Sequence, residues 1–133
     1  MTTKKGPQPW YRDHVWLISS IESMEDSPIS VETLELWESE GRLFSVDGAD
    51  GRRHYPHFQF QHDGQPFPVI RHLLQILQPC IDNWIILAWF RHPNSWILDE
   101  TMSKPTPIAP SAAFNRPEEL LRAAANFRGT YVA

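Results

Sequence analysis

The residues of this chain that could do chemistry are a group of histidines and a single cysteine. His54, His57 and His62 suggest a metal site, but a strand would place residues 54 and 57 on opposite faces. No carboxylate or cysteine stands beside them at a helical ligand spacing, which favours solvated hairpin histidines. Cys80 follows Pro79 without a strand-to-helix elbow, a glycine-rich phosphate loop or a carboxylate pair in a motif. The sequence therefore predicts no catalytic residue, metal or cofactor, and a protein that is not an enzyme.

Aromatic and basic residues in the C-terminal third suggest binding instead. Trp84 and Trp89 lie in an all-apolar stretch, which favours core packing, whereas Trp96 follows Pro93 in a predicted loop. Aromatic and arginine side chains dominate binding energy at interfaces. The predicted partner-binding residues are therefore Trp96, Lys104, Phe114, Arg116, Arg122 and Arg128. The alternative is that Trp96 packs beneath the proline-rich loop and that the arginines are ordinary solvated charges.

The elements that must position these residues are short helices and one hairpin. A chain of 133 residues with 12 prolines suits one compact domain with fixed corners, or a small module with an extension. Apolar periodicity, caps and turn residues predict helices near residues 12–24, 30–40, 68–78, 83–91 and 117–127, and a β-hairpin over about 42–60. The prolines of residues 99–114 predict an extended surface segment. The expected fold class is mainly α with a small β-hairpin.

Local patterns fix the ends and faces of these helices. Ser30 has the features of an N-cap and Gly41 those of a left-handed helix stop. Asp82 or Asn83 is the predicted cap of the helix over 83–91, and Asn115 or Arg116 that of the last helix. Further expectations are a stripe of Val31, Leu34 and Trp37 facing the core, a most buried run of Trp84, Ile86, Leu87 and Trp89, inward Leu120 and Leu121, and a helix end at Gly129.

A turn between Met24 and Ser30 followed by a capped helix resembles a helix-turn-helix, and the hairpin after it resembles a wing. The face of this helix opposite the apolar stripe presents Glu32, Glu35 and Glu38, which repel phosphates. We therefore expect weak or undetectable specific DNA binding, carried, if it occurs, by the wing residues Arg42, Arg52 and Arg53. The helix is better suited to a scaffold or a protein contact.

The net charge and the length of the apolar runs exclude further classes of protein. The net charge of −4 argues against a general nucleic-acid coat or a polybasic membrane binder. Residues 28–46 carry a net −3 and residues 101–133 a net +2, so a partner can recognise the two segments separately. A lone cysteine favours a reducing cytoplasm. The longest apolar run, residues 84–90, is seven residues against about twenty for a membrane span, so we expect no membrane association.

Several motifs together carry a family resemblance. They are SVETL at 30–34, GRLFSV at 41–46, YPHFQF at 55–60, GQP at 64–66, the apolar runs at 69–77 and 84–90, HPN at 92–94 with Leu98, and PEELLRAA at 117–124. In these motifs the chain resembles antitoxins of the Xre/MbcA/ParS type, small bacterial proteins with an N-terminal helix-turn-helix region and a C-terminal toxin-binding domain. The likeness covers roughly residues 28–127. The chain departs from the family at residues 98–105, which lack its tight glycine turn.

The resemblance implies both an organisation and a function. Residues 1–64 would form a degenerate helix-turn-helix with a wing-like hairpin, and residues 65–133 a compact helical toxin-binding domain, or the two would form one continuous unit. The protein would occlude a cognate toxin, often of the NAD-consuming RES-domain class, and repress its own operon through operator DNA, as a homodimer or hetero-oligomer. The alternatives are a DNA-binding transcriptional regulator and an orphan protein-binding adaptor without a toxin.

Overall fold

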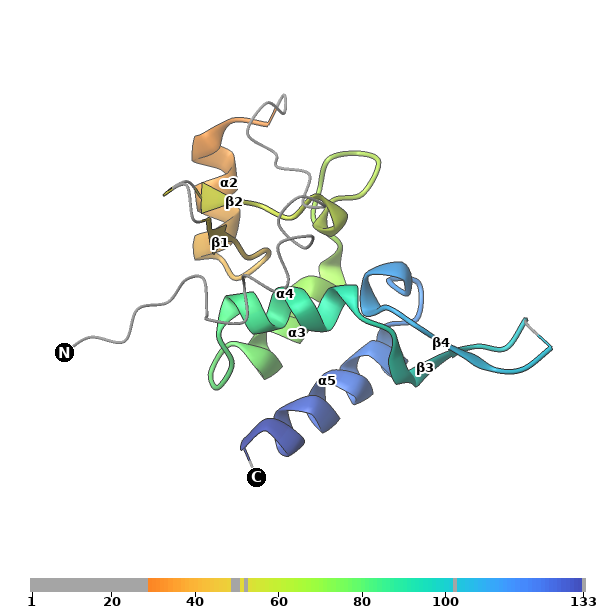
Figure 1. The fold of residues 1–133 in the computed structure, drawn as a ribbon. Helices are drawn as coiled ribbons and strands as arrows, with labels where there is room; N and C mark the ends of the chain where they lie inside the picture. The colour runs from red at the N-terminus through yellow and green to blue at the C-terminus, as the bar shows by residue number, and fades with distance from the viewer. Residues whose placement is uncertain (1–28, 49–50, 52, 102, 133) are drawn as a thin grey trace.

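The computed structural model describes residues 29–48, 51, 53–101 and 103–132 (Figure 1). The helix predicted near 12–24, and with it the first half of a helix-turn-helix, lies outside the described residues. The described elements are, in order, α2 (Val31–Ser39), β1 (Val46–Asp47), β2 (Arg53–His54), the 3-10 helix η3 (His57–Gln59), α3 (Pro68–Leu77), α4 (Asn83–Arg91), β3 (Asn94–Asp99), β4 (Thr106–Ile108), the 3-10 helix η4 (Pro110–Ala112) and α5 (Pro117–Val132). The predicted class, mainly α with a small β-hairpin, is confirmed.

The helix α2 begins and ends as its caps predict. The Ser30 hydroxyl accepts a hydrogen bond from the Thr33 N–H at 3.2 Å, which satisfies a donor that has no partner within the helix. Gly41 takes a φ of +74°, a left-handed conformation in which only glycine is unstrained. The chain can therefore turn sharply into residues 42–46.

One prediction about the face of α2 is wrong. Leu34 and Trp37 are buried, but Val31 is 54% exposed. The cluster that covers this face is small, and Ile29, just before the N-cap, packs against it where Val31 was expected. The buried members of this small cluster are Leu34, Trp37, Leu43 and Tyr55.

The predicted hairpin is present but much shorter than 42–60. β1 and β2 are antiparallel and pair Val46 with His54 and Asp47 with Arg53. The segment after Pro56 turns into η3 because proline has no N–H to continue a ladder. The fully buried side-chain amide of Gln59 makes hydrogen bonds in place of a ladder. Its Oε1 accepts from the Phe44 N–H at 2.8 Å, and its Nε2 donates to the Phe44 carbonyl at 3.0 Å.

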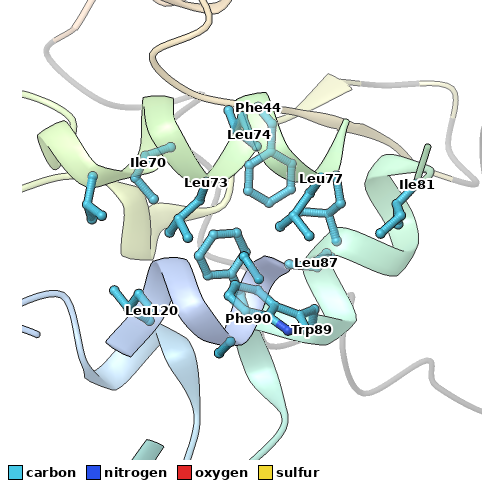
Figure 2. Packing of buried hydrophobic residues seen from close by; sticks show 14 of the residues in the cluster. Phe44, Ile70, Leu73, Leu74, Leu77, Ile81, Leu87, Trp89, Phe90 and Leu120 are labelled. Atoms are coloured by element: carbon cyan, nitrogen blue, oxygen red, sulfur yellow. The ribbon is translucent and has the colours of Figure 1, made fainter. Parts of the chain in front are cut away.

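The main core lies between α3, α4 and α5. Figure 2 shows Leu73 and Leu77 of α3 facing Leu87 and Phe90 of α4 across a packed interior. Trp84, Ile86, Leu87 and Trp89 are buried as predicted. Phe44 and Val46 also belong to this cluster, so side chains from before residue 64 complete a core formed mainly by residues after it.

Side-chain hydrogen bonds from the first turn of α4 link this helix to the hairpin of β1 and β2. Asp82 occupies the N-cap position, one of the two positions predicted for the cap. The next residue, Asn83, donates through Nδ2 to the Ser45 carbonyl at 2.9 Å, and Trp84 Nε1 donates to the Asp47 carbonyl at 3.2 Å. The β1 region therefore keeps a fixed position above the first turn of α4.

Residues 99–114 differ from the expected surface segment because part of them forms a second hairpin. β3 and β4 pair antiparallel, with Asn94 opposite Ile108 and Asp99 opposite Thr106. Pro107 within β4 hides the pattern in the sequence, and it is tolerated because a two-stranded sheet leaves one side of each strand unpaired. The hairpin extends away from the helices in Figure 1.

The last helix starts as predicted and continues further than predicted. The Arg116 carbonyl accepts the first helical hydrogen bond, from the Leu120 N–H at 3.1 Å, so Arg116 is the N-cap and Pro117 the first helical residue. Leu120 is fully buried and Leu121 partly so. Gly129 does not end α5, which runs to Val132, since a glycine inside a helix costs only about 1 kcal/mol.

We expect Trp89→Ala to lower the free energy of unfolding by about 3–5 kcal/mol, because it empties a site in which the side chain is only 6% exposed. Trp89→Phe should cost less, because a phenyl ring refills much of the site, and losing the indole N–H costs little, since it is a buried donor without an acceptor among the described residues. Urea unfolding of both variants measures this. Leu36→Ala on the exposed side of α2 is the control, with a change within about 0.5 kcal/mol. A loss below about 1 kcal/mol for Trp89→Ala contradicts the placement.

Candidate protein-interaction surface

Trp96 lies in strand β3 rather than in the predicted loop, and a bulge in this strand projects it from the protein. Between the pairs Asn94–Ile108 and Leu98–Pro107, β3 contains three extra residues that β4 does not match. The Trp96 N–H donates to Asn94 Oδ1 at 2.9 Å, a local turn that fixes the bulge. Ile97 is fully buried whereas its neighbour Trp96 is 49% exposed. The core thus anchors the strand at residue 97 and holds the indole of residue 96 outward.

The far end of this hairpin carries a second fixed turn. Asp99 Oδ1 accepts hydrogen bonds from the Thr101 N–H at 3.0 Å and the Thr101 hydroxyl at 2.6 Å. These bonds hold the pKa of Asp99 below its usual value, because they stabilise the carboxylate. Lys104 lies beyond the turn and is exposed. The hairpin therefore presents Trp96 near its base, and near its tip the Lys104 cation together with the carboxylates of Asp99 and Glu100.

Arg116 is used within the chain. Its Nε donates to Glu119 Oε1 at 2.6 Å, and its Nη2 donates to Glu119 Oε2, a bidentate pair. The hydrogen bonds from Arg116 lower the pKa of Glu119. A cation at a helix N-terminus is unfavourable alone, and Glu119 in the first turn compensates it. Arg122 and Arg128 of the same helix are exposed, and their side chains form no ion pair within the described part of the chain.

Phe114 lies mainly in the aromatic part of the core. Its ring stacks on Phe67 at a centroid distance of 4.5 Å and contacts Phe90 at 6.1 Å. It is half-buried, and its accessible edge forms part of a groove of about 320 Å³ with Pro117 and Leu121 of α5. Phe114 therefore contributes to the surface as the floor of a groove.

The sequence reasoning missed Arg71 and His72. Both lie on the exposed side of α3 and line a neighbouring hollow of about 320 Å³ that also includes Arg42. The amphipathic pattern of residues 68–78 contained the information: it points Leu73 and Leu74 inward, and residues 71, 72 and 75 outward. No sequence rule places a groove beside the polar residues of such a helix, so the pattern alone does not single them out.

The candidate DNA-binding arginines are held by local partners. The Arg42 guanidinium lies 5.2 Å from the Trp37 ring centre and donates to Gln65 Oε1 at 3.1 Å. Arg53 lies 3.6 Å from Glu38 and 3.8 Å from Asp47. Arg52 falls outside the described residues. Arg42 also lies 3.8 Å from Glu40, so carboxylates within the chain partly neutralise both described arginines.

Glu38 does not face solvent with Glu32 and Glu35 as expected. It accepts hydrogen bonds from the Ser45 hydroxyl at 2.7 Å and the Tyr55 hydroxyl at 3.0 Å, so it joins α2 to the hairpin. Burial of Tyr55 raises the pKa of its phenol to about 12, and the nearby negative charge of Glu38 adds to the shift. Glu32 and Glu35 remain exposed on α2, so its outer surface is still acidic.

Comparisons of the chain with family models, with curated proteins and with solved structures find no match. Within the described residues, no three histidine, cysteine, aspartate or glutamate side chains come together as a metal-binding group. In the same part of the chain, every helix is too short or too polar to span a membrane.

We expect the Tyr55 phenol to titrate near pH 12, and Glu38→Gln to lower that pKa because it removes a negative charge beside the phenolate. The unfolded phenol ionises near pH 10, so the folded state keeps its proton longer. Stability is then complete below about pH 10 and falls as the pH rises to about 12. Ultraviolet titration against Tyr55→Phe isolates the group. A phenol that ionises near pH 10 in the native protein contradicts the geometry.

For DNA, we expect weak or undetectable specific affinity, measured by fluorescence anisotropy of labelled duplexes at several salt concentrations. The reason is that Arg42 and Arg53 already have local partners and α2 is acidic. Where binding is found, replacing Arg52 and Arg53 by alanine should reduce the salt slope by about 0.9 for each phosphate that these arginines neutralise. Nanomolar binding that survives this double change removes the wing from the explanation.

Proposed function

We propose that this protein is a non-enzymatic antitoxin-like protein that binds a cognate toxin and occludes it. The motifs shared with antitoxins of the Xre/MbcA/ParS type suggest the class, and they suggest toxins of the NAD-consuming RES-domain class as the first candidates. The single observation that supports a binding role most strongly is the exposed Trp96, fixed in place by the bulge and by buried Ile97.

A rigid exposed tryptophan favours tight association. Each aromatic side chain can bury on the order of 150–250 Å² with few rotatable bonds, so a partner gains apolar contact at a small entropy cost. Trp96 is about half exposed. Its backbone N–H donates a hydrogen bond to Asn94 Oδ1, so this part of the backbone is already ordered before a partner binds. This pre-organisation lowers the entropic cost of ordering the β3 bulge when a partner binds.

The exposed cations of α5, the helix that packs beside β3, suit an acidic partner surface. β3 packs against α5, the helix that carries the exposed Arg122 and Arg128 (Figure 1). Lys104 lies at the hairpin tip, where the carboxylates of Asp99 and Glu100 offset its charge, so the basic character comes from α5. The acidic residues of α2 lie on another element, away from this surface. Repression of its own operon is the less favoured role, because Arg42 and Arg53 are held by partners within the chain.

The test is co-expression with each reading frame that flanks the gene in the source genome. We expect one of these frames to arrest growth, the chain to restore growth and the two products to elute as one complex. Trp96→Ala should weaken that complex at least tenfold, because it removes the central aromatic anchor. Isothermal titration calorimetry gives the ratio of dissociation constants.

Leu36→Ala is the matched control, since Leu36 is also a large apolar residue on the surface, 55% exposed, but lies on α2. It should leave the affinity unchanged. Equal binding by the wild-type and Trp96→Ala proteins, with both folded by circular dichroism, would falsify the assignment of the surface. A set of flanking products that neither arrest growth nor bind the chain rejects the antitoxin function.

A further inference from the structure

A continuous groove follows the exposed side of α3. Three neighbouring hollows of about 320, 320 and 470 Å³ share lining residues. The first and second share Phe67, Pro68 and His72, and the second and third share Arg71 and Gln75. The groove thus runs from the start of α5, along α3, to Gly41 at the end of α2.

The end of the groove beside α5 is apolar. The stacked rings of Phe67 and Phe114, whose centroids are 4.5 Å apart, lie beneath Pro117 and Leu121. Phe114 also contacts Phe58 and Phe90 of the interior, so the floor is part of the rigid core. Such a concave apolar surface suits one large apolar side chain of a partner.

The middle of the groove carries the exposed guanidinium of Arg71. The exposed His72 lies beside it, and α3 itself contains no carboxylate over Pro68–Leu77. The carboxylate that lines the far end, Glu40, is 3.8 Å from the Arg42 guanidinium and is therefore offset by it. Within a chain of net charge −4, this local excess of positive charge would attract an acidic ligand.

We propose that this groove binds an acidic peptide segment of another protein, with one large apolar side chain at the Phe67–Phe114 end and carboxylates at Arg71 and His72. The segment is a separate ligand from the proposed toxin contact at Trp96, since Phe114 alone is common to both sets of residues. Arg71 is the central recognition residue, because a guanidinium can hold a carboxylate through two hydrogen bonds.

A peptide fits the groove better than a nucleic acid does. A nucleic-acid strand needs a row of cations along its backbone. Here the cationic stretch is flanked by the apolar residues Phe67 and Pro117 on one side, and by Gln78 and Pro79 on the other. An apolar anchor next to a short acidic stretch matches both chemistries of the groove at once.

The test uses the full chain as bait for a displayed library of random twelve-residue peptides. We expect the enriched peptides to combine a large apolar residue with aspartate or glutamate. The affinity of the most enriched peptide, measured by fluorescence anisotropy, should fall at least tenfold with Arg71→Gln. Arg91→Gln, the matched control on α4, removes one positive charge outside the groove and should leave the affinity unchanged.

Several results overturn the proposal. Failure to enrich any peptide does so, as does enrichment of peptides without acidic residues or an equal loss of affinity in Arg71→Gln and Arg91→Gln. A dimer in sedimentation that Arg71→Gln dissociates makes a second copy of the chain the occupant. Tighter binding of single-stranded DNA than of every peptide makes nucleic acid the ligand. The co-expression test of Trp96 does not depend on any of these results.

Discussion

The packing around the Phe90 ring is the constraint on which the other features of this protein depend. Phe90 is fully buried, and its ring centre lies 5.7 Å from Phe44, 5.1 Å from Phe58 and 6.1 Å from Phe114. These rings come from the segment after α2, from η3, from α4 and from the segment before α5. Each such pair contributes about 0.5–1.5 kcal/mol beyond its buried area. Segments with few hydrogen bonds of their own are therefore held to one core.

The surface features follow from these positions. Phe114, once fixed against Phe90, stacks on Phe67 and becomes the floor of the α3 groove. The same core buries Ile97, which determines how β3 leaves α4 and why the bulge must project Trp96. The buried side chain of Gln59 forms hydrogen bonds to the backbone of Phe44, so it links η3 to the segment that precedes β1. Both candidate binding surfaces are thus outer faces of a single aromatic interior.

Local chemistry made the helices predictable. Ser30, Gly41 and Pro117 mark helix ends by mechanisms that act within a few residues, and the apolar run at 84–90 requires burial in any fold. The second hairpin, η3 and the position of Glu38 were not predictable, because pairing across β3 and β4 and the bonds of Glu38 to Ser45 and Tyr55 are set by tertiary contacts. The place of Trp96 after Pro93 singled it out but left open whether it packs beneath the proline-rich loop, whereas the Arg116–Glu119 pair and the α3 groove were found only in the structure.

The division of charge between the two ends of the chain gives the protein two distinct faces. The outer surface of α2 carries Glu32 and Glu35, whereas the exposed Trp96 lies on a strand that packs against α5 with its exposed Arg122. The most direct measurement of whether the second face binds a toxin is hydrogen–deuterium exchange of the chain alone and in complex with the toxic flanking product. We expect residues 94–108 and 121–128 to gain protection while residues 31–39 do not. Protection confined to residues 31–54 would place the interface on the acidic face and contradict the role of Trp96.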